Sequence, residues 1–263
     1  MPSSFFTQIG NDIYGEVAED FSGKVSISSD GSVVAIGSPR HLGPYDGPAE
    51  TRPISLGTNG HVRIFQNVNN TWIQVGSDID GKWASGAGSS VSLSSDGSVV
   101  ALVAWNYIGI YKNVNNTWTQ IGSDINGEID DFGSKSLSLS SDGSVVAIGS
   151  PSFRGNQYAS YQGNISAINL RDGRPAWQEE LSTFKDLTSN GNRIVAVDSK
   201  DIVKAFGTAT GALIWEQEDL KLRNLTSPAS ISNLIVVGDL EGYVHLLNAQ
   251  NGNFEEREKI SGD

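Results

Sequence analysis

A ten-residue sequence, SLSSDGSVVA, occurs at residues 92–101 and again at 138–147, and a near copy, SISSDGSVVA, occurs at 26–35. A second pair runs in phase with these copies, NVNNTWIQVGSDIDG at 67–81 and NVNNTWTQIGSDING at 113–127. Repetition at a period of this size is typical of folds that use one supersecondary unit several times. The first question is therefore what one unit folds into.

Each unit is predicted to contain four short antiparallel strands. The segments KVSISS and SVSLSS alternate apolar and small polar residues, as strands with one buried face do. Asp-Gly pairs at 30–31, 96–97 and 142–143 predict a two-residue turn into a nearly apolar strand, SVVAIGS in the first and third copies and SVVALVA in the second. HVRIFQNV and TWIQVGS, with their copies YIGIYKNV and TWTQIGS, supply the third and fourth strands. Four such strands per unit predict a blade of a β-propeller.

After about residue 160 the sequence of the unit changes. Three segments align on the turn pairs at 172–173, 210–211 and 251–252, and these are GNISAINLRDGRPAWQEEL, DIVKAFGTATGALIWEQEDL and GYVHLLNAQNGNFEEREKI. The whole chain is then an all-β protein with one propeller domain over 1–263. Its five predicted blades occupy residues 17–79, 84–125, 130–181, 184–220 and 223–260.

The two kinds of repeat resemble two different families. The SLSSDGSVVAIGSP and NVNNTWTQIGSDI segments make residues 4–151 similar to the FG-GAP repeats of integrin-alpha-like propellers. Residues 160–263 resemble repeats of the pyrroloquinoline-quinone (PQQ) type, on the pattern that runs from Ala167 to Trp177. Within that type they are most similar to the later blades of BamB, a family of outer-membrane assembly lipoproteins. The resemblance implies a propeller in both halves.

The change of repeat falls inside the third predicted blade. That blade begins with strands of the first kind and ends with strands of the second kind, so residues 152–160 form a junction within a hybrid blade. This arrangement favours a chimera of two propellers, made by design, over a natural fusion. The N-terminal segment copies a fourth strand, and residues 4–10 are expected to help close the ring beside the last blade.

Composition excludes several classes of function. The net charge is −12 with no basic stripe, which argues against binding to nucleic acid. The chain has no cysteine, and no segment has the length and apolarity of a membrane span. It also lacks a signal peptide and the lipoprotein cysteine, so the chain as written is expected to be cytoplasmic when expressed, whereas the family that it resembles is periplasmic.

Two sets of residues are candidates for a site. Oxygen ligands for calcium are offered by Asp78, Asp80, Asp124 and Asn126, but a calcium ion needs six to eight oxygens, so we expect these residues to form turns and predict no metal site. One aromatic residue per unit could form a ligand-stacking ring, but packing between blades is the favoured interpretation. These aromatic residues are Phe6, Trp72, Trp118, Trp177, Trp215 and Phe254.

No catalytic constellation is recognisable. His41, His61 and His245 lie in different repeats without metal-ligand spacing, and the calcium-binding and catalytic residues of quinone enzymes are missing, so no cofactor is predicted. The predicted function is a non-enzymatic propeller scaffold, an engineered or recombined chimera without a retained activity. Two alternatives stay open: a protein-interaction scaffold resembling BamB, and a calcium-dependent adhesion or carbohydrate-binding module resembling FG-GAP proteins. Self-association through unpaired strand edges is a further expectation.

Overall fold

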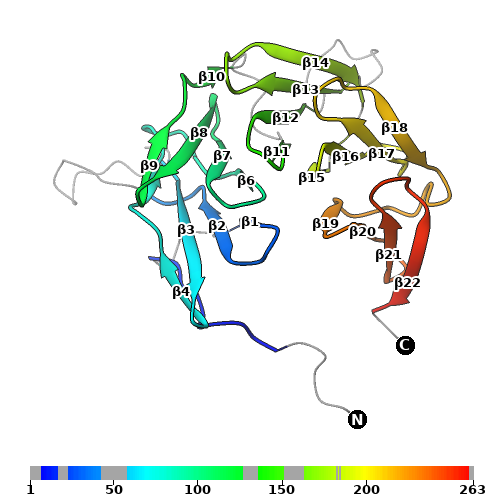
Figure 1. The fold of residues 1–263 in the computed structure, drawn as a ribbon, viewed down its shortest axis with the longest axis horizontal. Coiled ribbons are helices and arrows are strands. Elements are labelled where there is room, and N and C mark those ends of the chain that lie inside the picture. The colour runs from blue at the N-terminus through cyan, green and yellow to red at the C-terminus, as the bar shows by residue number, and fades with distance from the viewer. Residues whose placement is uncertain are drawn as a thin grey trace.

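Short strands account for all the regular structure in the part of the chain that the structure describes. The computed structural model describes residues 7–16, 23–42, 58–126, 136–150, 163–181, 183 and 185–260. The strands form five antiparallel sheets, each with at least four strands, arranged around a common centre (Figure 1). The protein is therefore an all-β, five-bladed β-propeller, and the predicted fold class is confirmed.

The strands follow the repeats of the sequence closely. Blade 1 contains β1 (Lys24–Ile27), β2 (Val33–Ser38), β3 (His61–Val68), β4 (Thr71–Gln74) and β5 (Ile79–Asp80). Blade 2 contains β6 (Ser90–Leu93), β7 (Val99–Val103), β8 (Tyr107–Val114), β9 (Thr117–Gln120) and β10 (Ile125–Asn126). Blade 3 contains β11 (Ser136–Leu139), β12 (Val145–Ser150), β13 (Asn164–Asn169) and β14 (Pro175–Glu180). Blade 4 contains β15 (Thr188–Asn190), β16 (Arg193–Val197), β17 (Val203–Gly207) and β18 (Leu213–Gln217). Blade 5 contains β19 (Ala229–Ile231), β20 (Leu234–Gly238), β21 (Tyr243–Asn248) and β22 (Phe254–Lys259).

Blade 3 is one continuous sheet although its sequence changes type halfway. Strand β12, which has the first kind of sequence, pairs along its whole length with β13, which has the second kind. The register runs from Val145 opposite Asn169 to Ser150 opposite Asn164. The junction at 152–160 lies outside the described residues. The hydrogen bonds of the ladder join the two kinds of repeat within one sheet.

The Asp-Gly turns differ from the two-residue hairpin that the sequence predicts. In blade 1 the amide of Ser28 donates to the carbonyl of Val33, so the loop between them has four residues. Only Gly31 in this loop has a positive φ, of 73°. The carboxylate of Asp30 accepts hydrogen bonds from the hydroxyls of Ser28 and Ser32. Side-chain hydrogen bonds therefore fix a longer turn than backbone preference alone requires.

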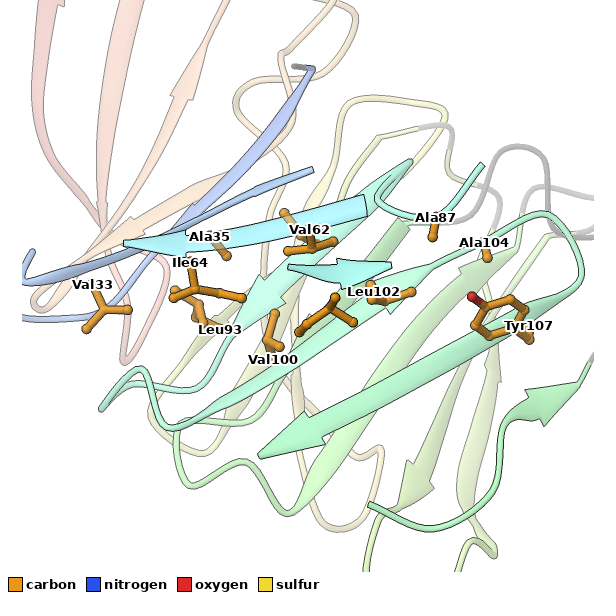
Figure 2. Close-up of a cluster of buried hydrophobic side chains, with 12 residues drawn as sticks. Val33, Ala35, Val62, Ile64, Ala87, Leu93, Val100, Leu102, Ala104 and Tyr107 are labelled. Atoms are coloured by element: carbon orange, nitrogen blue, oxygen red, sulfur yellow. The ribbon is translucent and has the colours of Figure 1, made fainter. Parts of the chain in front are cut away.

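The core lies between neighbouring blades. One cluster joins blades 1 and 2, and Figure 2 shows Val33 and Ile64 from blade 1 packed with Leu93, Val100 and Leu102 from blade 2. Similar clusters join blades 2 and 3, blades 3 and 4, and blades 4 and 5. Aliphatic side chains therefore form the core of four of the interfaces between blades.

The interface between blades 5 and 1 is different, and we call it the seam. Within the described residues the innermost strands pack against each other in succession from β1 through β6, β11 and β15 to β19, but β19 does not pack closely against β1. Val25 and Ile27 of β1 are 70% and 60% exposed, whereas the equivalent Val91 and Leu93 of β6 are 7% and 6% exposed. The innermost strand of blade 1 therefore lacks the cover that the neighbouring blade gives to β6.

The described part of the N-terminal segment lies against blade 1. The amide of Gly10 donates to the side chain of Asn70, and the amide of Trp72 donates to the side chain of Asn11. The guanidinium of Arg63 donates to the carbonyl of Tyr14. No ladder joins residues 7–16 to β22, so this part of the segment does not extend the last blade as the sequence suggested.

Candidate functional site

The tryptophans of blades 1 and 2 reach toward the preceding segment of the chain. The indole N–H of Trp118, on β9, donates to the carbonyl of Val75 in blade 1 over 2.8 Å. The indole N–H of Trp72, on β4, donates to the carbonyl of Ile9 over 3.0 Å. In both cases the ring lies against the glycine that follows the accepting residue, Gly76 for Trp118 and Gly10 for Trp72. We call a glycine covered in this way a seat. The N-terminal segment thus gives blade 1 the contact that blade 1 gives blade 2.

The tryptophans of blades 3 and 4 reach in the opposite direction. The indole N–H of Trp177, on β14, donates to the carbonyl of Thr208 in blade 4 over 2.7 Å. The indole N–H of Trp215, on β18, donates to the carbonyl of Ala249 in blade 5 over 3.0 Å. Their seats are the turn glycines of the next blade, Gly211 and Gly252. In this geometry each of the four tryptophans joins two neighbouring segments of the chain.

Phe254 does not take the position of these tryptophans. The ladder places Trp177 opposite Ala167 and Trp215 opposite Ala205, and the equivalent residue of blade 5 is Glu256, opposite Leu246. Phe254 instead contacts His245, with ring centroids 6.0 Å apart. The sequence alignment misplaced this residue because Phe254 follows its turn glycine by two residues rather than four. Phe6 lies outside the described residues.

The structure separates the four calcium candidates into two blades. Asp124 and Asn126 lie in blade 2, where the ammonium of Lys82 forms an ion pair with Asp124. The same ammonium lies 4.9 Å from the centre of the Tyr107 ring. The Asp124 carboxylate also accepts a hydrogen bond from Gln120. The ammonium of Lys82 therefore neutralises the Asp124 carboxylate.

Asp78 and Asp80, in blade 1, belong to a cluster that sequence reasoning missed. Nδ1 of the fully buried His61 lies 3.5 Å from the Asp78 carboxylate, and donor atoms of His61, Asp78 and Asp80 all lie within 4.8 Å of one another. His41 stacks on His61 at 4.0 Å between ring centroids, and donor atoms of Glu16, His41 and His61 form a second triad of the same size. Burial and the charge of Asp78 raise the pKa of Asp80.

The cluster lies next to a solvent-accessible pocket. Asp78 and Asp80 line a pocket of about 410 Å³ together with residues of blade 2. The chain brings the cluster together because β5 pairs with β3, which places Asp80 directly opposite His61. His41 comes from the end of the β2 region and Glu16 from the N-terminal segment. Spacing along the chain gives no signal for these contacts, because they depend on the pairing of β5 with β3 and, for Glu16, on the position of the N-terminal segment.

Blade 5 carries a second pocket, of about 390 Å³, lined by Arg223, His245 and Phe254 among others. Nε2 of the buried His245 lies 2.9 Å from the carboxylate of Asp239, which also accepts from Arg223. Burial of Asp239 is outweighed by these hydrogen bonds and by the one from the Tyr243 amide, so the pKa of Asp239 is lowered. His245, Asp239 and Arg223 therefore form one hydrogen-bonded, ion-paired network beside this pocket.

These features define a β-propeller scaffold whose blades are joined by aliphatic clusters and tryptophans. The family of the outer membrane protein assembly factor BamB matches residues 115–263, which is more than half of the chain. The chain therefore belongs to this family. The BamB proteins of Escherichia coli K12 and of Legionella pneumophila strain Paris are 42% and 36% identical to it, over 38% and 40% of this chain. The match covers 26% and 27% of those proteins, so the chain spans about a quarter of the length of the curated relatives that it matches.

Two solved structures share the fold at low sequence identity. The crystal structure of BamB from Moraxella catarrhalis matches 93% of this chain and 76% of its own, with a TM-score of 0.52 and 23% identity. The C-terminal WD40 domain of Sif2 matches 96% of this chain and 64% of its own, with a TM-score of 0.54 and 13% identity. These likenesses concern the fold alone. Within the described residues, no helix has the length and apolarity that crossing a membrane requires.

Proposed function

We propose that the chain is a non-enzymatic scaffold that binds another protein along the seam between blades 5 and 1. The observation that carries this proposal is the exposure of Val25 and Ile27, whose equivalents in the next blade are buried. Ile231 of β19 is 62% exposed. Exposed apolar side chains on strands that face an incompletely packed interface are typical of protein-binding surfaces.

Family membership supports a partner from the machinery that assembles outer-membrane proteins. The curated relatives carry the name of outer membrane protein assembly factor. The net charge of −12 favours a partner other than nucleic acid. The proposed role is therefore to hold a protein component of that machinery at the seam, without a chemical step.

Site-specific photocrosslinking in a Gram-negative cell envelope tests this role. A photoreactive residue at Ile27 is expected to give a discrete adduct with a component of the outer-membrane assembly machinery. The matched control is Trp105, which is also exposed but belongs to blade 2, away from the seam. Adducts of equal yield at both positions, or adducts only with a second copy of the chain, would contradict the proposal. The second result would favour self-association.

We further propose that residues 1–151 descend from an FG-GAP-type propeller and 161–263 from the BamB type, recombined or engineered into one domain. The opposite directions of the tryptophans on the two sides of the interface between blades 2 and 3 support this origin. Hydrogen exchange at increasing denaturant tests the single domain. Peptides from 58–126 and 185–260 are expected to lose protection at one common midpoint. Two separate midpoints would mean that the halves unfold as two domains.

A further inference from the structure

The cluster around His61 differs from its counterpart in blade 2 at the positions that bear on cation binding. The β-ladders make His61 and Asp80 the equivalents of Tyr107 and Asn126, because each pair lies directly opposite in its own blade. Asp78 is the equivalent of Asp124, and both accept a hydrogen bond from the glutamine four residues before them. Blade 1 therefore has an imidazole and a second carboxylate where blade 2 has a phenol and an amide.

The largest difference between the two clusters is the charge of the residue at the position of Lys82. Residues 11–16, NDIYGE, align with 77–82, SDIDGK, so Glu16 stands where the chain has Lys82 one repeat later. In blade 2 Lys82 neutralises Asp124 and covers the ring of Tyr107. In blade 1 the same position brings a third carboxylate to the cluster. Arg63 lies 3.8 Å from the carboxylate of Glu16.

The donor set suits a zinc-like ion better than calcium. Calcium binds six to eight oxygens, whereas zinc and similar ions bind imidazole nitrogen and carboxylate oxygen with four ligands. Tetrahedral zinc places its donor atoms about 3.4 Å apart. The donors of His61, Asp78 and Asp80 lie within 4.8 Å of one another, so side-chain movements of at most about 1.4 Å bring them to tetrahedral spacing around an ion. The adjacent pocket gives a path for entry.

We propose that His61, Asp78 and Asp80 bind a divalent transition-metal ion of the zinc class, with His41 and Glu16 next to it. The ion supplies the positive charge that Lys82 supplies in blade 2. Because Glu16 belongs to the N-terminal segment, the ion also stabilises the position of this segment on blade 1.

Zinc titration of the full, untagged chain after removal of metal by a chelator tests the proposal. Calorimetry is expected to show one zinc ion per chain. Zinc at about 100 times its Kd is expected to raise the midpoint of thermal unfolding by roughly 5 to 10 °C. Calcium at the same concentration is expected to leave the midpoint unchanged. The absence of saturable zinc binding, or a shift with calcium but not with zinc, would overturn the proposal.

Variants that introduce into the blade 1 cluster the residues found at the equivalent positions of the blade 2 cluster test where the ion binds. Asp80→Asn and Glu16→Lys are each expected to weaken zinc binding by at least ~10-fold. Both substitutions introduce a residue that the same fold accepts at the equivalent position, and the unfolding midpoint of the metal-free variants checks that they fold. The matched control is Asp124→Asn in blade 2, which is expected to bind zinc as the unmodified chain does. Unchanged affinity in either variant, or an equal loss in the control, would place the ion elsewhere and defeat the proposal.

Discussion

Blades 1 and 2 and blades 4 and 5 use the same kind of contact in opposite directions. In the first pair, the tryptophan of the later blade covers a glycine of the earlier one, Gly76. In the second pair, the tryptophan of the earlier blade covers a glycine of the later one, Gly252. An aromatic ring over a glycine is thus a general way to join blades, and either neighbour can supply the ring.

Within the part of the chain that the structure describes, the reversal leaves the interface between blades 2 and 3 without such a contact. Gly122 of blade 2 and Gly173 of blade 3 are the equivalents of the covered glycines, and a Cβ added to either would meet no atom of the described residues within 4 Å. Aliphatic side chains join these two blades instead, among them Val103, Ile108 and Leu139. The change of repeat type therefore removes the tryptophan contact at this interface, while the buried core continues across the join.

The largest effect is expected for the tryptophan contact itself. Trp215→Ala is predicted to lower the free energy of unfolding by about 3 to 5 kcal/mol, because it removes a buried ring and its hydrogen bond to Ala249. Phe254→Ala is expected to cost less than about 1 kcal/mol, since Phe254 is 41% exposed and covers no glycine seat. Urea unfolding of both variants measures the difference. Equal losses would show that the register position of the aromatic residue does not matter.

Substitutions of two aliphatic residues at equivalent strand positions compare the packed interface between blades 2 and 3 with the seam. Leu139→Ala, in the buried cluster between blades 2 and 3, is predicted to cost about 2 to 4 kcal/mol. Ile27→Ala, at the seam, is predicted to change the free energy of unfolding by less than about 0.5 kcal/mol in the isolated chain. The same urea experiment measures both values. A large loss for Ile27→Ala would mean that blade 5 covers β1 in solution.

Alanine substitution is expected to show a smaller difference in stability between a glycine covered by a tryptophan and an uncovered one. Gly252→Ala and Gly173→Ala share the strain of a positive φ, of 75° and 69°. In Gly252→Ala the new Cβ would also lie 2.6 Å from the ring of Trp215, so a loss of about 2 to 3 kcal/mol is expected, against about 1 kcal/mol for Gly173→Ala. Thermal unfolding distinguishes the two. A similar pair, Gly76→Ala and Gly122→Ala, repeats the test in the blades of the first kind.

The periodic features of the sequence predicted the fold well, because each blade repeats the same local rules. Alternating strands, turn glycines and one aromatic residue per unit lead directly to four-stranded blades. The direction of each tryptophan was not predictable, because the ring can pack on either neighbouring blade. The convergence of His41 and His61 with Asp78 was also hidden, since it requires the short strand β5 and the N-terminal segment to lie beside β3.

The smallest expected effect concerns the Asp-Gly turns of the first kind of repeat. Hydrogen bonds from the hydroxyl of Ser28 and from the amide and hydroxyl of Ser32 lower the pKa of Asp30 from 3.8 to about 2. Because the folded pKa is lower than the unfolded one, the charged carboxylate stabilises the fold above pH 4, and this contribution is lost as the pH falls toward 2. Asp30 is largely exposed, so solvent screening keeps the contribution small.

Asp30→Asn is therefore expected to make the chain slightly less stable at pH 7 and to flatten the decline of its unfolding midpoint between pH 4 and pH 2. Acid titration of the unfolding midpoint by circular dichroism measures this slope. The control is Asp172→Asn in blade 3, whose carboxylate accepts a backbone hydrogen bond from Arg174 and lacks the two serine hydroxyls. It is expected to keep the slope of the unmodified chain. If Asp172→Asn flattens the slope as much as Asp30→Asn does, the serine hydroxyls do not set the acid response, and the turns of the two kinds of repeat are electrostatically equivalent.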